Sequence, residues 1–175
     1  MTGDVRAASA AATDGAFAAV FDANAARLVR FAAFLGAEDA EDVVQEAFCR
    51  LYARRATFTG DVHQAGAYLH RTVLNLVRDR GRRHVRTVRI LRLHHRDAER
   101  VAPSVELLSQ ASEEGRRLVA ALGCLPRRRR EAVTLRFWLD LSYSEIAAAM
   151  GTSVGAAKSA VSRGIDDLHR HLEQP

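Results

Sequence analysis

The stretch LSYSEIAAAMGTSVGAAKSAVSRGIDDLHRHL (residues 141–172) decides the fold of the C-terminal part of this chain. Ser142 and Glu145 have the spacing of a capping box, in which each side chain binds the backbone N–H of the other residue, and this predicts the start of a short helix. Gly151 ends that helix, and a hydroxyl residue directly after it caps a second, longer one. Two helices joined by a glycine-containing turn predict a helix-turn-helix.

The second of these helices is the one expected to contact DNA. In a helix-turn-helix, the second helix enters the major groove, and its outward face meets the base edges. Here that face is rich in small residues, which would let the helix backbone come close to the groove wall. An ordinary helical hairpin is the alternative that this pattern leaves open. The residues expected at the DNA are Ser153, Gly155, Lys158, Ser159, Ser162 and Arg163.

The basic charge of the chain is concentrated in one segment. The net charge is +5 over 175 residues, but the segment from Arg78 to Arg100 alone holds nine arginines against three acidic residues. Such a patch is typical of a surface that binds a polyanion, because each arginine that neutralises a phosphate releases condensed counterions. A solvated helix end that runs into a disordered tail has the same composition. Charge alone therefore does not decide between these two interpretations.

Composition argues against several other classes of protein. No apolar run approaches the roughly 18 residues of a membrane span, and residues 1–12 lack the apolar core of a secretion signal. We therefore expect a cytoplasmic protein with no membrane partner. Cys49 and Cys124 lie far apart, without a second cysteine or a histidine at a metal-ligand spacing, so we expect two reduced thiols. No catalytic residue, metal site or cofactor is predicted.

The rest of the chain has the apolar periodicity of helices and no signal for strand pairing. The first helix is predicted to begin with Asp14 as its cap and to stop at Gly36. From Arg82 to about Ser112 the period is lost, with Pro103 near the middle, which predicts a linker with a helical extension at its start. The sequence therefore predicts an all-α protein. The other expected helices are residues 39–55, 65–80, 113–122 and 127–138.

Three motifs, in this order, are similar to those of a known family. They are DAEDVVQEAFCRLY (residues 39–52), AYLHRTVLNLVRDRGRR (67–83), and the block that runs from CLPRRRR to SRGIDDL (124–168). Together they resemble the bacterial RNA polymerase sigma factors of the compact extracytoplasmic-function (ECF) group, over nearly the whole chain from residue 14 to 172. The resemblance implies two small helical domains joined by a flexible linker, and a protein that directs an enzyme without being one.

The resemblance also implies what each part of the chain does. Residues 14–84 would bind core RNA polymerase and would recognise and melt the downstream (−10) promoter element. Residues 85–112 would be the linker, and residues 113–173 would read the upstream (−35) element through the helix-turn-helix. The polymerase would be contacted at the clamp helices of its largest subunit and at the flap of its second-largest subunit. Whether an anti-sigma factor also binds the chain stays open.

Individual site residues follow from the same resemblance. A helix face with charges of both signs would dock on the clamp helices through Asp42, Gln45, Glu46 and Arg50. The loop of residues 58–66 would capture a base flipped out of the downstream element, for which a pocket and a stacking surface are needed. The residues expected there are Phe58, Asp61 and His63. The following helix would present Tyr68, Arg71, Asn75 and Arg78 to DNA, and Arg82 and Arg83 would extend that side for phosphates.

Two other classes of function stay open at this point. A stand-alone helix-turn-helix regulator is the second hypothesis, but it would need a sensor or dimerisation domain, and the N-terminal half has neither a heptad seam nor a ligand-pocket signature. An enzyme is the least favoured class, because no nucleophile with its base, no carboxylate pair and no metal motif stands out. Promoter-specific RNA made together with core polymerase would separate the first two hypotheses.

Overall fold

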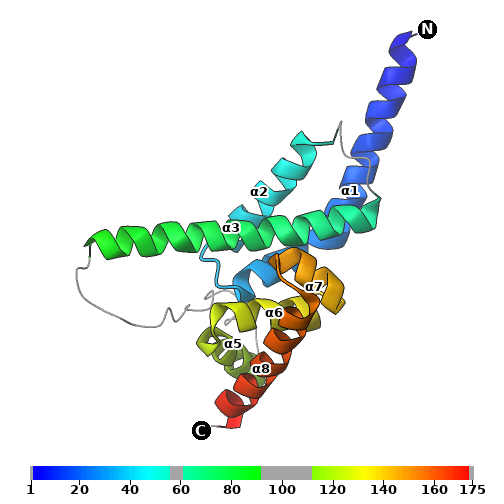
Figure 1. Cartoon of the computed structure of the whole chain (residues 1–175). Coiled ribbons are helices and arrows are strands. Elements are labelled where there is room, and N and C mark those ends of the chain that lie inside the picture. The colour runs from blue at the N-terminus through cyan, green and yellow to red at the C-terminus, as the bar shows by residue number, and fades with distance from the viewer. Residues whose placement is uncertain (1, 56–60, 92–111, 174–175) are drawn as a thin grey trace.

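The structure, a computed structural model, describes residues 2–55, 61–91 and 112–173 of the chain. Within these ranges the chain forms α-helices joined by short turns, and no strand occurs. The prediction of an all-α protein is therefore confirmed. Figure 1 shows the helices of the N-terminal part and, on one side of them, the group of helices from the C-terminal part.

The N-terminal helices are α1 (Thr2–Phe34), α2 (Ala40–Ala53) and α3 (Val62–Leu91), and each of them packs against the other two. Apolar residues at helical spacing turn inward from all three helices and form a shared apolar core. The fully buried residues include Leu28, Phe31, Val43, Leu69, Val73 and Leu74.

Two of these helices are longer than their sequence patterns predict. The expected cap at Asp14 is wrong, because residues 2–34 form one continuous helix. Residues 7–13, directly before Asp14, include five alanines, and alanine has the highest helix propensity, so an acidic residue inside the run does not start a new helix. Helix α3 continues to Leu91, and residues 85–91 of the expected linker therefore belong to this helix. Residues 92–111 lie outside the described part of the chain.

The C-terminal group consists of α5 (Glu113–Cys124), α6 (Arg127–Phe137), α7 (Tyr143–Met150) and α8 (Val154–Glu173). The Ser112 hydroxyl accepts a hydrogen bond from the Gly115 N–H at 3.2 Å and so caps α5. Pro126 directly precedes α6, and its missing backbone N–H costs the helix no hydrogen bond at this position. Helix α8 lies against α5, α6 and α7 and closes the group.

The predicted helix-turn-helix is present as α7 and α8. The capping box is complete, because the Ser142 hydroxyl accepts from the Glu145 N–H while the Glu145 carboxylate accepts from the Ser142 N–H. Gly151 ends α7 with φ +66°, in the left-handed region that a residue without a Cβ adopts most easily. The Ser153 hydroxyl then accepts from the Ala156 N–H at 3.2 Å and caps α8. The helix-turn-helix prediction is confirmed.

A close contact between α6 and α8 fixes the position of the second helix. Gly164 on α8 is buried against α6, and a Cβ atom there would lie 2.5 Å from the Val133 Cγ2 atom. One turn further along, the buried carboxylate of Asp167 binds the guanidinium groups of Arg129 and Arg170. Close packing and a buried ion pair therefore hold α8 on α6 by its inner face and leave the outer face free.

The N-terminal and C-terminal groups share one continuous apolar cluster. Buried side chains of α1, α2 and α3 and of α6, α7 and α8 belong to the same cluster. Helix α7 lies directly below α3, and the end of α1 reaches α5 (Figure 1). The two groups of helices are therefore packed together in this structure.

Candidate DNA and protein interfaces

All six residues expected to meet the upstream DNA are exposed on or beside α8. Five of them lie along one side of the helix, at the spacing that puts side chains on one face. Ala157, Val161, Gly164 and Leu168 occupy the opposite side and are buried. The exposed face carries two cationic groups, those of Lys158 and Arg163, between hydroxyls and small residues. Such donors can bind phosphate oxygens and the acceptors of guanine in the major groove.

The face of α2 that was predicted to dock on a protein is built around Glu46. Its carboxylate accepts from the Arg50 guanidinium at 2.6 Å and from the Arg80 guanidinium of α3 at 3.0 Å. The hydrogen bond from Arg80, followed by that from Arg50, lowers the pKa of the Glu46 carboxyl. Asp42 and Gln45, on the same helix, are exposed. The predicted residues thus form a face with charges of both signs whose centre is tied to α3.

On α3 the structure leaves Arg71 and Asn75 exposed. Tyr68 is half-buried, and the Arg54 guanidinium carbon lies 5.8 Å from the centre of its ring. Arg82 pairs with Asp79 one turn earlier on the same helix. Arg83 is exposed as well, whereas Phe58 lies outside the described residues. This face of α3 therefore offers an amide and several guanidinium groups to a polyanion.

Three further residues predicted at the downstream element also have partners within the chain. The Asp61 carboxylate accepts from the Gln64 N–H at 2.8 Å and so caps α3. His63 Nε2 lies 3.4 Å from a carboxylate oxygen of Glu145 on α7. Arg78 binds the carboxylate of Glu131 on α6 through two hydrogen bonds. In this arrangement Arg78 and His63 face the C-terminal helices, and their DNA roles stay predictions.

His70 lies on α3 between His63 and Arg78, and its imidazole is largely buried. Its Nδ1 atom has no hydrogen-bond partner within the described ranges. Burial, and to a smaller extent the charge of Arg27, lowers the pKa of His70 to about 4, although Glu145 acts in the opposite direction. The imidazole is therefore neutral at pH 7.

An apolar pocket lies between the C-terminal helices and the end of α1. Its volume is about 330 Å³, and its walls come from α1, α5, α6 and α8. Phe137 stands at this pocket with 65% of its surface exposed, and Leu118 is exposed beside it. Exposed apolar surface around a hollow is typical of a site for a protein segment or a small apolar ligand.

Glu131 and Trp138 contact the N-terminal helices and were not predicted as functional residues from the sequence. The position of Glu131 directly before the apolar residues of α6 was a signal, because a carboxylate that is buried with such residues rarely lacks a partner. The partner itself lies 53 residues away, at Arg78. Periodicity within one helix carries no information about a contact over that distance.

Within the described residues, no helix is long and apolar enough to cross a membrane. The same part of the chain contains no group of three or more histidine, cysteine, aspartate or glutamate residues that could hold a metal ion.

Two family models match the chain, one in each group of helices. "Sigma-70 region 2" matches residues 20–87, and "Sigma-70, region 4" matches residues 115–168. The first match covers α2, the C-terminal part of α1 from residue 20 onward and most of α3, and the second covers α7 and most of α8, which form the helix-turn-helix. Both matches agree in order and position with the three motifs of the sequence.

Relatives of known type match over most of the chain. The ECF RNA polymerase sigma factor SigE of Mycolicibacterium smegmatis is 36% identical over 137 residues, which is 77% of this chain and 52% of that protein. The ECF RNA polymerase sigma factor BldN of Streptomyces coelicolor is 36% identical over 142 residues, 78% of this chain and 52% of that protein. The chain thus spans about half the length of these two relatives. The ECF RNA polymerase sigma-E factor of Escherichia coli K12 is 33% identical over 144 residues, 77% of this chain and 74% of that protein.

A solved structure has the same fold. It is the sigma factor RpoE in complex with the anti-sigma factor NepR from Bartonella quintana, which matches with a TM-score of 0.68 and 26% identity. The match covers 89% of this chain and 92% of that chain. It therefore extends over both groups of helices.

Proposed function

Because the chain belongs to the sigma-70 family of RNA polymerase sigma factors, in the extracytoplasmic-function group, we propose that it binds core RNA polymerase and directs promoter-specific initiation of transcription. In this role it recognises the −35 and −10 elements of a promoter and melts the second. The observation that carries the proposal is the presence of region 2 and region 4 in one chain, with the outer face of the recognition helix exposed. The role is not catalytic, and it belongs in the cytoplasm with the polymerase.

Docking on the polymerase is assigned to the face of α2. Asp42, Gln45, Glu46 and Arg50 lie on one side of a helix whose other side is buried, so their charges can meet a partner without disturbing the core. Paired charges of both signs favour a specific partner over a general polyanion, because a wrong partner places like charges together. The clamp helices of the largest subunit are the partner that we propose for this face.

The apolar pocket around Phe137 and Leu118 supports a second polymerase contact. A hollow with exposed apolar walls accepts the apolar side of a helix. We assign this pocket to the flap of the second-largest subunit. An anti-sigma factor is a further partner that we propose, on the ground that the similar sigma factor from Bartonella quintana is bound to one.

DNA recognition is divided between α8 and α3. The exposed face of α8 with Lys158 and Arg163 is proposed to read the −35 element in the major groove. Arg71 and Asn75 on α3, with Arg82 and Arg83 further along, are proposed to contact the −10 element and its phosphates. The loop before α3 is proposed to hold a flipped base.

Transcription in vitro tests this proposal. The protein is mixed with core polymerase and a library of genomic fragments, and the 5′ ends of the RNA products are mapped. Discrete start sites that require the protein are expected. Asp42→Arg should lose them, because it places a positive charge in the docking face, whereas Glu173→Arg, at the exposed end of α8, should keep them.

The stand-alone regulator predicts a different result. If core polymerase gives no promoter-specific RNA with the protein, and the protein alone protects duplex DNA from cleavage, the regulator is the correct class. In that case Asp42→Arg would have no effect on DNA protection.

A further inference from the structure

A largely buried ion pair joins the two groups of helices. Arg78 on α3 donates from Nε and Nη2 to the two carboxylate oxygens of Glu131 on α6, at 2.8 and 2.6 Å. The side chain of Arg78 is 17% exposed and that of Glu131 is 2% exposed. Arg127, on the same helix as Glu131, approaches this carboxylate only to 3.7 Å. A two-bond pair of this kind is strong and geometrically specific, and a buried carboxylate without its partner is costly.

A second contact connects α1 with the end of α6. The Arg27 guanidinium donates to the Trp138 carbonyl at 3.0 Å from Nε and 2.7 Å from Nη2. In return, the Trp138 indole N–H donates to the Arg27 carbonyl at 3.0 Å. The Phe34 ring meets the Trp138 ring edge-on, with centroids 4.9 Å apart. Trp138 therefore binds α1 through its backbone and its side chain together.

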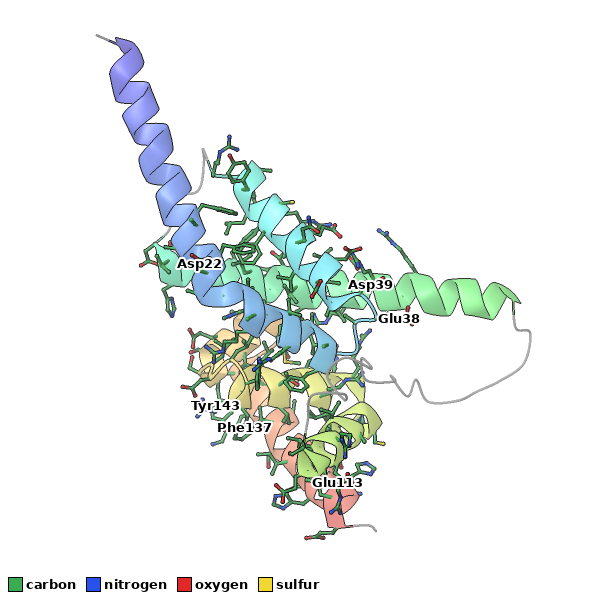
Figure 2. The ribbon with its side chains drawn as sticks, turned by 180° about the vertical axis from the view of Figure 1, so that it is seen from behind. Asp22, Glu38, Asp39, Glu113, Phe137 and Tyr143 are labelled. Carbon is green, nitrogen blue, oxygen red and sulfur yellow. The ribbon has the colours of Figure 1, made fainter. Side chains whose placement is uncertain are left out.

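The third contact brings α3 onto the helix-turn-helix itself. His63 lies 3.4 Å from Glu145, the residue that also completes the capping box of α7. Around it, the apolar cluster continues from the N-terminal helices into α7 without a break. Figure 2, which views the molecule from behind, shows α1 and α3 lying across the C-terminal helices along this side.

From these contacts we propose that the free chain is held closed by an intramolecular latch, consisting of the Arg78–Glu131 pair and the Arg27–Trp138 contact, and that the latch restrains binding to the polymerase. The inference rests on the proposed function, in which both promoter elements are read at once. Elements at −35 and −10 lie about 25 base pairs apart, or about 85 Å of straight duplex. In the closed chain α7 lies directly against α3, so the chain must open before its two DNA-reading faces can reach both elements.

Closure occupies some of the proposed contact residues and leaves others free. Arg78 and His63, both expected at the −10 element, are turned to Glu131 and Glu145. Phe34 of α1 lines the apolar pocket assigned to the flap. The recognition face of α8 stays exposed. The latch therefore restrains the −10 and flap contacts and leaves the −35 contact accessible.

The position of the two domains can be measured on the free protein, because each carries one exposed cysteine. Cys49 lies on α2, and Cys124 lies at the end of α5. Spin labels on both, read by pulsed electron paramagnetic resonance, should give one narrow distance distribution for the wild type. Glu131→Gln removes a charge that contacts neither partner in the proposed function, and it should shift the distribution to longer and broader distances. Glu113→Gln is the control, because Glu113 pairs with Arg116 on its own helix and lies far from α3 (Figure 2).

A second variant keeps the test independent of the folding of α6. Arg78→Gln changes the opposite member of the pair, on the other domain, and should open the chain to the same extent. The double variant should open no further than either single one, since both remove one interaction. Circular dichroism establishes that each variant keeps its helices. An unchanged distance distribution in Arg78→Gln and in every folded Glu131→Gln preparation would refute the latch.

The restraint is measured by the affinity of the unlabelled protein for core polymerase. When only a fraction of the molecules is in the binding-competent state, the apparent affinity is lower than the intrinsic affinity by that fraction. Glu131→Gln should therefore bind core polymerase about tenfold more tightly than the wild type and Glu113→Gln do. An open Glu131→Gln chain with unchanged affinity would refute the restraint. Failure of every variant to bind core polymerase would refute the proposed function, and the distance measurement would still report on the latch.

Discussion

Replacing Gly164 by alanine tests how closely α8 packs on α6. Gly164 lies on the inner face of α8, where an added Cβ would stand 2.5 Å from Val133 Cγ2 and 3.2 Å from the backbone oxygen of Arg129. Contacts below 3 Å do not persist, so one of the helices must move. The Val133 side chain is branched at Cβ and stiff, and the Arg129 oxygen belongs to the first turns of α6. Neither neighbour can yield by simple rotation of a flexible side chain.

The magnitude follows from two opposing effects. Overpacking of a well-filled core costs about 1–3 kcal/mol, and the upper end applies here because a backbone atom is involved. Alanine in place of glycine within a helix gains about 1 kcal/mol. The expected net loss in the free energy of unfolding is therefore about 2 kcal/mol. For a chain of 175 residues that unfolds as one cooperative unit, a loss of this size corresponds to a decrease in Tm of about 4–8 °C.

Thermal and urea unfolding, followed by circular dichroism, measure this loss, and Gly155→Ala is the control. Gly155 lies on the same helix, but a Cβ there meets nothing within 4 Å among the described residues. The control should be neutral or more stable by about 0.5 kcal/mol. Both variants carry the same glycine-to-alanine substitution, but their expected effects on the free energy of unfolding are opposite in sign. If Gly164→Ala is as stable as Gly155→Ala, the close contact of α8 with α6 is wrong.

Two further predictions concern single side chains. Burial lowers the pKa of His70 to about 4, below the value of about 6.5 in the unfolded chain. The contribution of the neutral imidazole to stability is therefore complete above pH 6.5 and is lost as the pH falls through 4. Unfolding in urea at pH 7.5 and pH 5 should therefore differ by about 2 kcal/mol, and His70→Gln should remove most of that difference; an equal acid sensitivity in the variant would contradict the burial of the imidazole. Lys158→Ala should weaken binding of a −35 duplex by about tenfold, as measured by fluorescence anisotropy, while stability stays the same, and an unchanged affinity would remove Lys158 from the site.

Local signals predicted the helix-turn-helix correctly. The capping box and the glycine after α7 involve residues at most four positions apart, and both appear in the structure as the sequence indicates. The same holds for the six exposed residues at α8, since helical periodicity separates them from the buried Ala157 and Val161. Where a feature depends only on near neighbours, sequence is sufficient to predict it.

The contacts between the two groups of helices could not be predicted in this way. Helical periodicity places Arg78 on a polar face, and a polar face can meet DNA, water or a carboxylate of the same chain. Glu131 lies 53 residues away on a different helix, so the choice between these partners is made by tertiary packing. His70 shows the same ambiguity, because helical periodicity places it on the polar face with Arg71 and does not indicate that its Nδ1 atom is buried.

The prediction that α1 begins at Asp14 was wrong for a different reason. Asp14 is a good cap in isolation, but the alanines around it favour helix on both sides, and a continuous helix gains backbone hydrogen bonds that a cap would only replace. Propensity summed over the run therefore outweighs the preference of one residue.

The continuation of α3 to Leu91 limits how far the two domains can separate. Seven residues that would span about 25 Å as extended chain rise only about 10 Å as helix. From residue 92 to residue 112 the chain can then reach at most about 70 Å, whatever conformation it adopts. In the proposed function, this length of chain sets an upper bound on the spacer between the two promoter elements that one molecule can occupy, independently of the polymerase. Promoters with a longer spacer would lose the simultaneous contact of both domains.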